Sequence, residues 1–527
     1  MPVFLSAAEA VTLIPDSSFV LFGGSGGGHA VPEAVIEALS TRYRQTASPR
    51  DLTVCSTVSL GDWEQTGFNR LAHKGLVKRV VSAGVNNCPR MAELGLAENI
   101  DIYLLPQGVL SQLCRDSAAG RPGLLTRVGL HTFVDPRRGG GLQTGAGGDE
   151  RVRLMNIDGN EYLFYPALPI DVAVIRGTTA DEEGNISMED EAVFGEMFSM
   201  ACAAHNRGGT VIAQVNRVAQ ARTLPGKQVK VPGALVDCVV VDPAQAQTYQ
   251  LDFDPAYAGH LRVPDSTIAV TAMSIRKAMA RRAAMELYPG DIVNLGFGVA
   301  NDIATVAVEE GFLGDLTLTV EQGLFGGAPA GGKDAGAGRN YAAMVDQPYQ
   351  FDFYDGGGLD IAFLSFAQVD AEGNVNVSRF GNSIGGPGGF INISQGTRRV
   401  VFLGTLTAKS ARVHPDGTGG LRIEAEGQVR KWLPAVDQIT FNGRYALEQG
   451  QQISFITDRA VFDLTSSGLV CTEIARGIDF ERDIQAQIGF PVQKADSLRE
   501  IDPRVYRDEP MKLLTDFHAR GTRRARG

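Results

Sequence analysis

Short apolar runs that end abruptly at glycine or at one polar residue recur along the chain. Phe19–Phe22 is wholly apolar, and residues 316–320 alternate leucine and valine with threonine, so both are predicted to be strands. A glycine-rich segment follows each run, at residues 23–28 and 323–327, and glycine permits turns that bring a ligand close to the backbone. Residues 291–295 form a third such strand before a further glycine turn.

Helical spacing follows these glycine turns. Pro32 stands near the first turn of a helix that places Val35, Ile36 and Leu39 on one face. Ser274 is positioned to cap a helix in which apolar residues recur every four positions. The alternation of strand, glycine turn and helix predicts an α/β fold with open sheets.

A repeat at one offset indicates two halves of similar fold. Asp181 and Asp370 each begin a D-x-x-G-N turn between two strands, at an offset of 370 − 181 = 189. Val211 and Val400 lie in a second matching pair, and 400 − 211 is again 189. Residues 243–264 lack a clear periodicity and are interpreted as a linker. We therefore expect two similar α/β domains in tandem, at residues 1–245 and 266–517, with a linker at 246–265 and a basic tail at 518–527.

Composition narrows the class of protein. With 44% hydrophobic and 21% charged residues, the chain is an ordinary globular protein, and a net charge of −11 argues against a nucleic-acid partner. The six cysteines form no CxxC pair, so neither a zinc site nor a disulfide framework is predicted. No run of about 18 apolar residues and no basic leader appears. These features predict a cytoplasmic protein that neither crosses a membrane nor is exported.

Two polar residues follow predicted strands and are candidates for chemistry. Glu321 ends the strand at 316–320, and Gln107 follows the strand at 101–105. In open α/β sheets, ligands bind at the carboxyl edge of the strands, so an acid there is a catalytic candidate. The competing interpretation is a solvated turn residue.

The first glycine segment also matches a hydrolase motif. Residues 23–27 read G-x-S-x-G between a strand and a helix, which would make Ser25 a nucleophile. An α/β-hydrolase needs several strands before its nucleophile, and only one precedes Ser25. A glycine-rich loop that faces a ligand is therefore the favoured interpretation.

Two nucleotide-binding patterns are incomplete. Gly296-x-Gly298 resembles a dinucleotide fingerprint, but Asn301 stands where its third glycine belongs. Residues 327–333 approach a phosphate loop, but Asp334 replaces the required serine or threonine. A further glycine-rich stretch at 381–393 offers N–H groups for an anion.

The assembled motifs occur in family order over nearly the whole chain. They resemble those of family I CoA-transferases, in the single-chain form of the bacterial short-chain acyl-CoA:acetate or 3-oxoacid enzymes and the propionate CoA-transferases. The matching segments are residues 106–108, 129–141, 281–287, 293–298, 320–327, 385–390 and 477–483. Phe297 and Ala300 depart from the isoleucine and proline that related chains often carry, which affects the shape of the acyl pocket.

The resemblance implies two CoA-transferase domains and a role for each matched residue. It makes Glu321 the nucleophile, with an oxyanion formed during the reaction met by the Gln107 side chain and by the backbone at Gly388 and Gly389. It assigns coenzyme A to the turn made of Gly296, Phe297, Gly298, Val299 and Ala300. The substrate loop comprises Gly24, Ser25, Gly26 and Gly323. Coenzyme A is then a substrate, with no permanently bound cofactor and no metal.

The implied reaction moves CoA from a short-chain acyl-CoA to a carboxylate through a glutamyl-CoA thioester. A glutamate is already ionised at neutral pH and needs no base to attack. We expect acyl-CoA and small carboxylates as partners, no nucleic acid or membrane, and a homo-oligomer, either dimer or tetramer. Three alternatives stay open: an acyl-CoA hydrolase on the same fold, a serine hydrolase using Ser25, and a non-catalytic CoA sensor.

Overall fold

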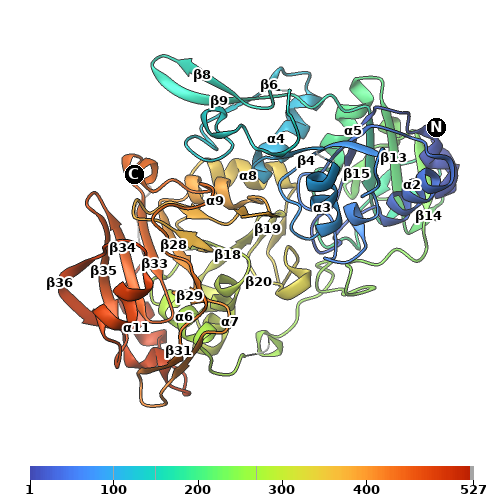
Figure 1. The fold of residues 1–527 in the computed structure, drawn as a ribbon. Coiled ribbons are helices and arrows are strands. Elements are labelled where there is room, and N and C mark those ends of the chain that lie inside the picture. Colours follow the sequence, from blue (N-terminus) through green and yellow to red (C-terminus); the bar gives the residue numbers. More distant parts are fainter. Residues whose placement is uncertain (99, 149, 269, 523–527) are drawn as a thin grey trace.

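The computed structural model describes residues 1–98, 100–148, 150–268 and 270–522. Figure 1 shows two α/β domains beside each other, the first coloured blue to green and the second yellow to red. The tandem α/β arrangement predicted from the repeat is therefore confirmed. Most of the predicted basic tail, residues 523–527, lies outside the described residues.

The first domain is built on a nine-stranded sheet, counted over the described residues, in the order β1-β16-β13-β10-β2-β3-β4-β5-β7. Every pairing is parallel except that of β7 with β5. The strands are β1 (Val3–Leu5), β2 (Phe19–Phe22), β3 (Leu52–Cys55), β4 (Val77–Ser82), β5 (Asp101–Leu104), β7 (Leu142–Thr144), β10 (Val172–Arg176), β13 (Thr210–Val215) and β16 (Cys238–Val241). The helices are α1 (Ala7–Ala10), α2 (Glu33–Thr46), α3 (Pro89–Glu98), α4 (Gln107–Ala118) and α5 (Met197–Asn206).

The second domain has a ten-stranded sheet in its described part, in the order β22-β19-β18-β17-β23-β28-β33-β34-β35-β36. Its centre, from β18 to β33, is parallel. The strands are β17 (Ile292–Leu295), β18 (Thr317–Val320), β19 (Leu324–Phe325), β22 (Ala343–Met344), β23 (Ile361–Ser365), β28 (Arg399–Leu403), β33 (Gln452–Ile456), β34 (Ala460–Thr465), β35 (Gly468–Ile474) and β36 (Gln493–Glu500). The helices are α6 (Ile275–Ala284), α7 (Asp302–Glu310), α8 (Gln347–Asp355), α9 (Phe390–Gly396), α10 (Gly443–Glu448) and α11 (Leu514–Ala519).

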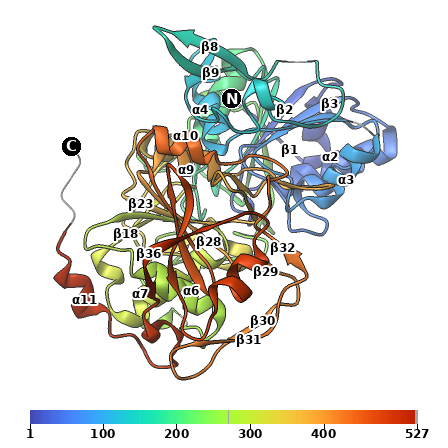
Figure 2. The same ribbon diagram turned by 60° about the vertical axis from the view of Figure 1, so that its left-hand side comes forward.

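Smaller sheets decorate both domains. Strands β8 and β9 form a hairpin that projects from the first domain in Figures 1 and 2. The remaining strands are β6 (Gly123–Thr126), β8 (Arg153–Ile157), β9 (Asn160–Pro166), β11 (Thr179–Asp181), β12 (Ile186–Ser187), β14 (Arg217–Ala219), β15 (Val229–Val231), β20 (Ala328–Pro329), β21 (Gly338–Arg339), β24 (Gln368–Val369), β25 (Val375–Asn376), β26 (Arg379–Phe380), β27 (Ser383–Ile384), β29 (Thr407–Ala408), β30 (Arg412–Pro415), β31 (Leu421–Ala425) and β32 (Val429–Arg430).

The repeat is reproduced atom by atom at its D-x-x-G-N turns. The amide N–H of Asn185 donates to Asp181 Oδ1 (3.0 Å) and its side chain donates to Oδ2 (2.9 Å). Asn374 makes the same two bonds to Asp370, at 3.1 and 3.0 Å. The two turns thus have one conformation, held by an aspartate that caps its own loop.

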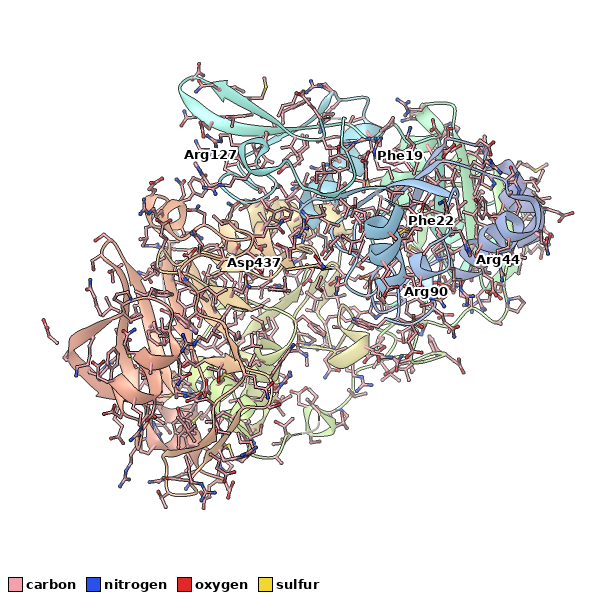
Figure 3. All side chains as sticks on the ribbon, viewed as in Figure 1. Phe19, Phe22, Arg44, Arg90, Arg127 and Asp437 are labelled. Atoms are coloured by element: carbon pink, nitrogen blue, oxygen red, sulfur yellow. The ribbon has the colours of Figure 1, made fainter. Side chains whose placement is uncertain are left out.

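Buried strands form the core of each domain. Phe19 and Phe22 of β2 are 4% and 1% exposed and lie inside the first domain, whereas Arg44 on α2 is exposed at its rim (Figure 3). The second sheet has a separate apolar cluster on each of its faces, one beneath α6 and α7 and one that includes Trp432. Continuous apolar strands covered on both faces are typical of parallel sheets.

The two domains meet where helix α4 of the first packs against α8 and α9 of the second (Figure 1). Residues 242–264 contain neither a helix nor a strand, as expected of the linker. They nevertheless bind both domains, because Tyr249 Oη donates to Glu33 (3.0 Å) and Thr248 Oγ1 donates to Asp334 (2.9 Å). In the part of the chain that the structure describes, no helix is both long and apolar enough to span a membrane.

Candidate active site

Glu321 lies in the tight turn that joins β18 to β19 at the carboxyl edge of the second sheet. Val320 pairs with Leu324 across this turn, so Glu321 stands directly after the strand, as predicted. Gly323 makes the turn possible, since its φ of +113° is unfavourable for other residues and an added Cβ would lie 2.0 Å from the carbonyl oxygen of Val345. The half-buried carboxylate is therefore fixed at the sheet edge.

A buried polar network lies beneath the Glu321 carboxylate. Tyr354 Oη on α8 donates to Thr319 Oγ1 (2.9 Å) and accepts from Asn294 Nδ2 (3.3 Å). Burial raises the pKa of Glu321 above its ordinary value, while hydrogen bonds, including those from Asn294 and Gln322, act in the opposite direction. Both amides thus favour the ionised form of the carboxylate.

Gln107 is the first residue of α4, three residues beyond the end of β5. The prediction placed it at a strand end, but Pro106 is the N-cap of a helix that Gln107 begins, and a proline there costs no helical hydrogen bond. The backbone N–H of Gln107 donates to the carbonyl oxygen of Gly388 (2.9 Å). Its side-chain Nε2 is buried and has no hydrogen-bond partner among the described residues, which leaves an amide donor for a ligand.

The glycine stretch before α9 surrounds this side chain. An added Cβ at Gly388 or Gly389 would lie 3.8 or 3.7 Å from Gln107 Oε1. The N–H of Gly388 is already used, because it donates to the carbonyl oxygen of Ala83 (2.9 Å). Gly388 therefore contacts the first domain through its N–H. This leaves the N–H of Gly389 as the candidate for the expected backbone donor.

Helix α8 connects the two candidate groups. Burial raises the pKa of Tyr354 well above its ordinary value, and the nearby Glu321 carboxylate raises it further. One turn earlier, Phe351 packs against Gly108, whose added Cβ would lie 2.5 Å from the phenyl ring. The ring centroids of Phe351 and Tyr354 are 5.7 Å apart, and the rings are packed edge to face. A single short helix thus spans from the Glu321 network to the start of α4.

The turn assigned to coenzyme A lies at the carboxyl end of β17, next to β18. It comprises Gly296, Phe297, Gly298, Val299 and Ala300. Phe297 is 66% exposed, which is unusual for a phenylalanine side chain. Ser365 Oγ donates to the carbonyl oxygen of Phe297 (2.9 Å), and Arg276 donates to that of Gly298 (2.6 Å). The turn is rigidly held and presents an aromatic ring outward.

The glycine loop of the first domain reaches the loops beside Glu321. An added Cβ at Gly336 would lie 3.2 Å from Gln322 Cδ and 3.3 Å from the ring of His29, so these two side chains are neighbours across the domains. Neither ring nitrogen of His29 nor Gln322 Oε1 has a partner within the described chain. Sequence reasoning missed both residues, because their meeting depends on the domain arrangement.

The serine-hydrolase alternative is not supported at this loop. Ser25 is 2% exposed, and its Oγ lacks a hydrogen-bond partner in the residues that the structure describes. A nucleophilic serine requires a base within hydrogen-bonding distance. The predicted loop residues Gly24 and Gly26 lie on either side of it, and Gly26 accepts a hydrogen bond from Asn87 (3.2 Å).

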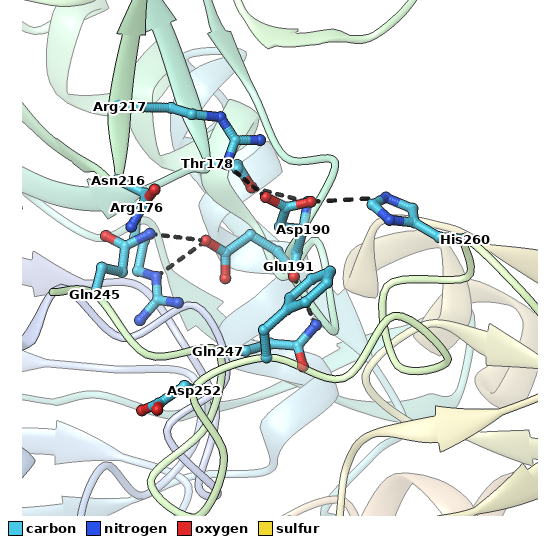
Figure 4. Close-up of a pocket in the computed structure, with 11 residues that line it drawn as sticks. Arg176, Thr178, Asp190, Glu191, Asn216, Arg217, Gln245, Gln247, Asp252 and His260 are labelled. Carbon is cyan, nitrogen blue, oxygen red and sulfur yellow. Dashed lines mark hydrogen bonds and ion pairs between the residues drawn. The ribbon is translucent and has the colours of Figure 1, made fainter. Parts of the chain in front are cut away.

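A polar pocket of about 400 Å³ lies elsewhere, at the carboxyl ends of β10 and β13 (Figure 4). Arg176 is paired with Glu191 at 3.0 Å, and Arg217 is paired with Asp190 at 2.7 Å. His260 contacts the backbone of Glu189 (2.8 Å). Since its cations are neutralised by neighbouring acids and it contains neither candidate group, we assign the chemistry to Glu321 instead.

Comparisons with known proteins show the family to which the chain belongs. A model of the Coenzyme A transferase family matches residues 4–242. The caffeate CoA-transferase of Acetobacterium woodii is 44% identical over 517 residues, covering 97% of this chain and 98% of that protein. The acetate CoA-transferase YdiF of Escherichia coli K12 is 42% identical over 511 residues, covering 97% and 96%. A crystal structure of the E. coli O157:H7 acyl-CoA transferase YdiF, a thioester complex with CoA, matches with a TM-score of 0.92 at 40% identity, covering 97% of each chain.

Identity of this extent over nearly the whole chain defines the class of protein. The chain belongs to the coenzyme A transferase family, and it is a CoA-transferase. The fold class and the enzyme class expected from the sequence are thereby confirmed.

Proposed function

We propose that this enzyme transfers CoA from a short-chain acyl-CoA to a small carboxylate acceptor, of the acetate, propionate or 3-oxoacid type. The observation that carries the proposal is Glu321, a carboxylate fixed at the sheet edge on the strand next to the predicted CoA turn. The names of the relatives, which include an acetate CoA-transferase, support this substrate class. A role in short-chain fatty acid or ketone body metabolism would follow from such substrates.

The reaction begins with attack by a Glu321 carboxylate oxygen on the thioester carbonyl. The carbon–sulfur bond breaks, and CoA thiolate leaves an acyl-glutamyl anhydride. The thiolate then attacks the glutamyl carbonyl, which releases the acyl carboxylate and forms a glutamyl-CoA thioester. An acceptor carboxylate reverses both steps, so the thioester is conserved without ATP and no net proton is taken up.

Each attack places negative charge on a carbonyl oxygen, and fixed donors must meet it. The free amide of Gln107 supports this role, since its Nε2 is buried without a partner among the described residues. The start of helix α4 adds a favourable dipole, because helix N-termini attract negative charge. Gly389 supplies the backbone donor in this proposal.

Coenzyme A requires cations near its phosphates in a protein of net charge −11. Lys333 fits this requirement, because its side chain is 47% exposed and its ion pair with Glu64 is long, at 3.8 Å. Its ammonium group can therefore turn to a phosphate. Its loop touches the predicted CoA turn, where Asn301 donates to the carbonyl oxygen of Ala330 (3.3 Å). We therefore assign Lys333 to phosphate binding.

We also propose that the predicted domain boundaries, 1–245 and 266–517, apply, and that the enzyme is a cytoplasmic homo-oligomer. The projecting β8–β9 hairpin supports association, because Leu154, Met155 and Ile157 are 37%, 41% and 40% exposed. Light scattering should give a dimer or tetramer. A strict monomer near 56.2 kDa would contradict this part of the proposal.

The transfer reaction is tested by a matrix of acyl-CoA donors against carboxylate acceptors, with free CoA followed in parallel. We expect acyl-CoA formation from the acceptor without release of CoA. Release of CoA that outpaces transfer would instead establish the hydrolase alternative.

A further inference from the structure

Helices α4 and α8 begin at the domain interface, and each is capped by the other domain. The N–H of Gly108 donates to Asn392 Oδ1 (3.0 Å), beside the Gln107 contact with the second domain. In return, the N–H of Gln347, the first residue of α8, donates to the carbonyl oxygen of Gly195 (3.1 Å). The first N–H groups of a helix have no partner inside it. The start of α4 is therefore fixed by contacts with the second domain.

A buried glutamate lies between these two helices. Glu196, 2% exposed, accepts at Oε1 from Ser111 Oγ on α4 and from Gln347 Nε2 on α8, both at 2.6 Å. Its Oε2 accepts from Thr57 Oγ1 (3.1 Å), just after β3. One carboxylate thus joins α4, α8 and the edge of the first sheet.

Asp355, the last residue of α8, is a second carboxylate that joins α4 to the second domain. Asp355 accepts from Asn392 Nδ2 (2.9 Å) and from Gln112 Nε2 on α4 (3.0 Å). By holding the Asn392 amide, Asp355 directs the Asn392 oxygen toward Gly108. The orientation of the first turn of α4 therefore depends on this carboxylate.

The contacts follow one face of α4. Gly108, Ser111, Gln112 and Arg115 are spaced as i, i+3, i+4 and i+7, which places them on one side of a helix. The hydrogen bonds to Glu196 and Asp355 come from hydroxyl and amide groups, so each charge is buried without a cation bonded to it. Such an arrangement costs stability, and it therefore calls for a functional reason.

We propose that Glu196 and Asp355 are positioning residues, which in their ionised form hold α4, and through it the Gln107 amide, against the second domain during catalysis. The inference rests on the proposed oxyanion role of Gln107. Neither carboxylate touches substrate; both act through the helix.

The surroundings of both carboxyls favour titration near neutral pH. Burial raises the pKa of Glu196 and of Asp355 to about 7 each. The charged neighbours of Glu196 and Asp355 are Asp346, paired with Lys230, and Asp352, paired with Arg115. The two acids in these pairs raise the pKa values further. The other titratable neighbours are Cys55, Cys114 and Tyr165, whose pKa values are also raised, in part by these carboxyls.

Protonation of Glu196 or Asp355 turns one accepting oxygen into an O–H donor, which then faces the hydroxyl and amide donors around it. One hydrogen bond to that carboxyl is lost, so the contacts that hold α4 weaken as the pH falls through about 7. Stability changes in the opposite direction. A carboxyl whose pKa is raised in the folded state contributes stability below its unfolded pKa, and this contribution is lost as the pH rises through about 7. Activity and stability therefore respond to pH with opposite signs.

The experiment compares Glu196→Gln, Asp355→Asn and the double variant with the wild type from pH 5.5 to 9. The readouts are kcat, KM, the rate of glutamyl-CoA thioester formation without acceptor, and the midpoint of thermal unfolding. Because an isosteric amide presents N–H donors to existing donors, we expect each single variant to lose about 10- to 100-fold in kcat at pH 8, with KM nearly unchanged. Wild-type kcat should fall by up to about tenfold for each of the two carboxyls from pH 8 to 6, since a group with a pKa of about 7 is about one-tenth ionised at pH 6. The double variant should lose this acid limb.

Asp352→Asn is the matched control on the same helix. Asp352 is exposed, accepts from Gln112 (3.1 Å) and pairs with Arg115. The asparagine keeps an oxygen that can accept from Gln112 and Arg115 and removes only the charge, so kcat at pH 8 should stay within about twofold. The acid limb should shift to lower pH, because a negative charge beside Asp355 is lost.

Wild-type kcat and an unchanged acid limb in the double variant would overturn the inference, as would a loss confined to thermal stability. The proposed function fails differently. In that case the wild type itself would form no thioester at Glu321, whatever the variants do.

Discussion

The two domains share a strand arrangement and use the same sheet edge differently. In the first, β2 lies between β10 and β3; in the second, β17 lies between β23 and β18. Ser56 follows β3 as Glu321 follows β18. Ser56 is fully buried, and its Oγ donates to the carbonyl oxygen of Val58 (2.7 Å). Glu321 is half-buried beside an Asn294 oxygen that has no partner in the described residues.

The two domains therefore share a fold but differ in which polar groups at the sheet edge are satisfied within the domain. At the edge of the first sheet, Ser56 and the Arg176–Glu191 ion pair (Figure 4) have partners within their own domain, whereas the Ser25 hydroxyl has none among the described residues. In the proposed function, its contribution to catalysis is the Gln107 side chain at the start of α4. In the same proposal, the edge of the second sheet holds the nucleophile Glu321 and binds coenzyme A. The proposed site therefore requires both domains.

The largest effect should come from Glu321→Gln, which keeps the shape of the side chain and removes the anionic oxygen. We expect transfer to fall by at least about 10⁴-fold, as when a covalent nucleophile is removed. Incubation of the wild type with acyl-CoA alone should attach CoA to Glu321, and peptide mapping after borohydride reduction should find the change in the fragment around residues 320–322.

Ser56→Ala and Ser25→Ala are the matched controls in the first domain, and both should keep the label and most of the activity. An acyl group on Ser25 would favour the hydrolase alternative. Full activity in Glu321→Gln, with hydrolysis back to glutamate excluded by mass, would mean that the acyl group passes directly between substrates.

The second prediction tests what the first domain contributes. Replacing Gln107 by alanine removes the only side-chain donor that we assign to the oxyanion, so kcat should fall about 10²- to 10³-fold. KM for acyl-CoA should change little, because the charge appears only in the transition state. The rate of thioester formation, measured by mass spectrometry in single turnover, checks this. A change in KM alone would make Gln107 a binding residue.

Much of this comparison could be predicted from the sequence. The ends of β2, β17 and β18 were located from apolar runs that stop at glycine or at one acid, because a buried parallel strand must end where the chain turns to solvent. The repeat was visible as well, since each D-x-x-G-N turn is fixed by an aspartate within four residues.

The contacts across the interface could not be predicted. Glu196 meets Ser111 and Gln347 from 85 and 151 residues away, and Gly108 meets Asn392 from 284. Periodicity reports which face of a helix is buried but not which side chain it meets. Gln107 was placed at a strand end for the same reason, because the sequence did not reveal that Gly388 completes the first turn of α4.

The third prediction concerns the turn between β18 and β19, which holds Glu321 at the sheet edge of the second domain. Gly323→Ala should destabilise the enzyme by about 1–3 kcal/mol and lower kcat, because the new Cβ lies 2.0 Å from the Val345 oxygen at a positive φ. Gly120→Ala in the first domain is the control, since it also has a positive φ, +66°, but nothing lies within 4 Å of its added Cβ. Thermal unfolding and kcat check the pair. Equal losses in both variants would attribute the effect to backbone strain and not to the turn beside Glu321.

The smallest effect should come from the phosphates of coenzyme A. Lys333 is half-exposed and only loosely paired, so its contact with a phosphate is worth about 0.5–1 kcal/mol and Lys333→Ala should raise KM for acyl-CoA roughly two- to fivefold. Added salt should raise KM in the wild type more than in the variant. Salt screens the attraction between Lys333 and a phosphate, and the variant already lacks this attraction. Lys74→Ala is the control, on an exposed lysine of the first domain paired with Glu98 at 2.8 Å. A KM that responds neither to salt nor to Lys333→Ala would mean that backbone donors at the edge of the second sheet, and not cations, hold the phosphates.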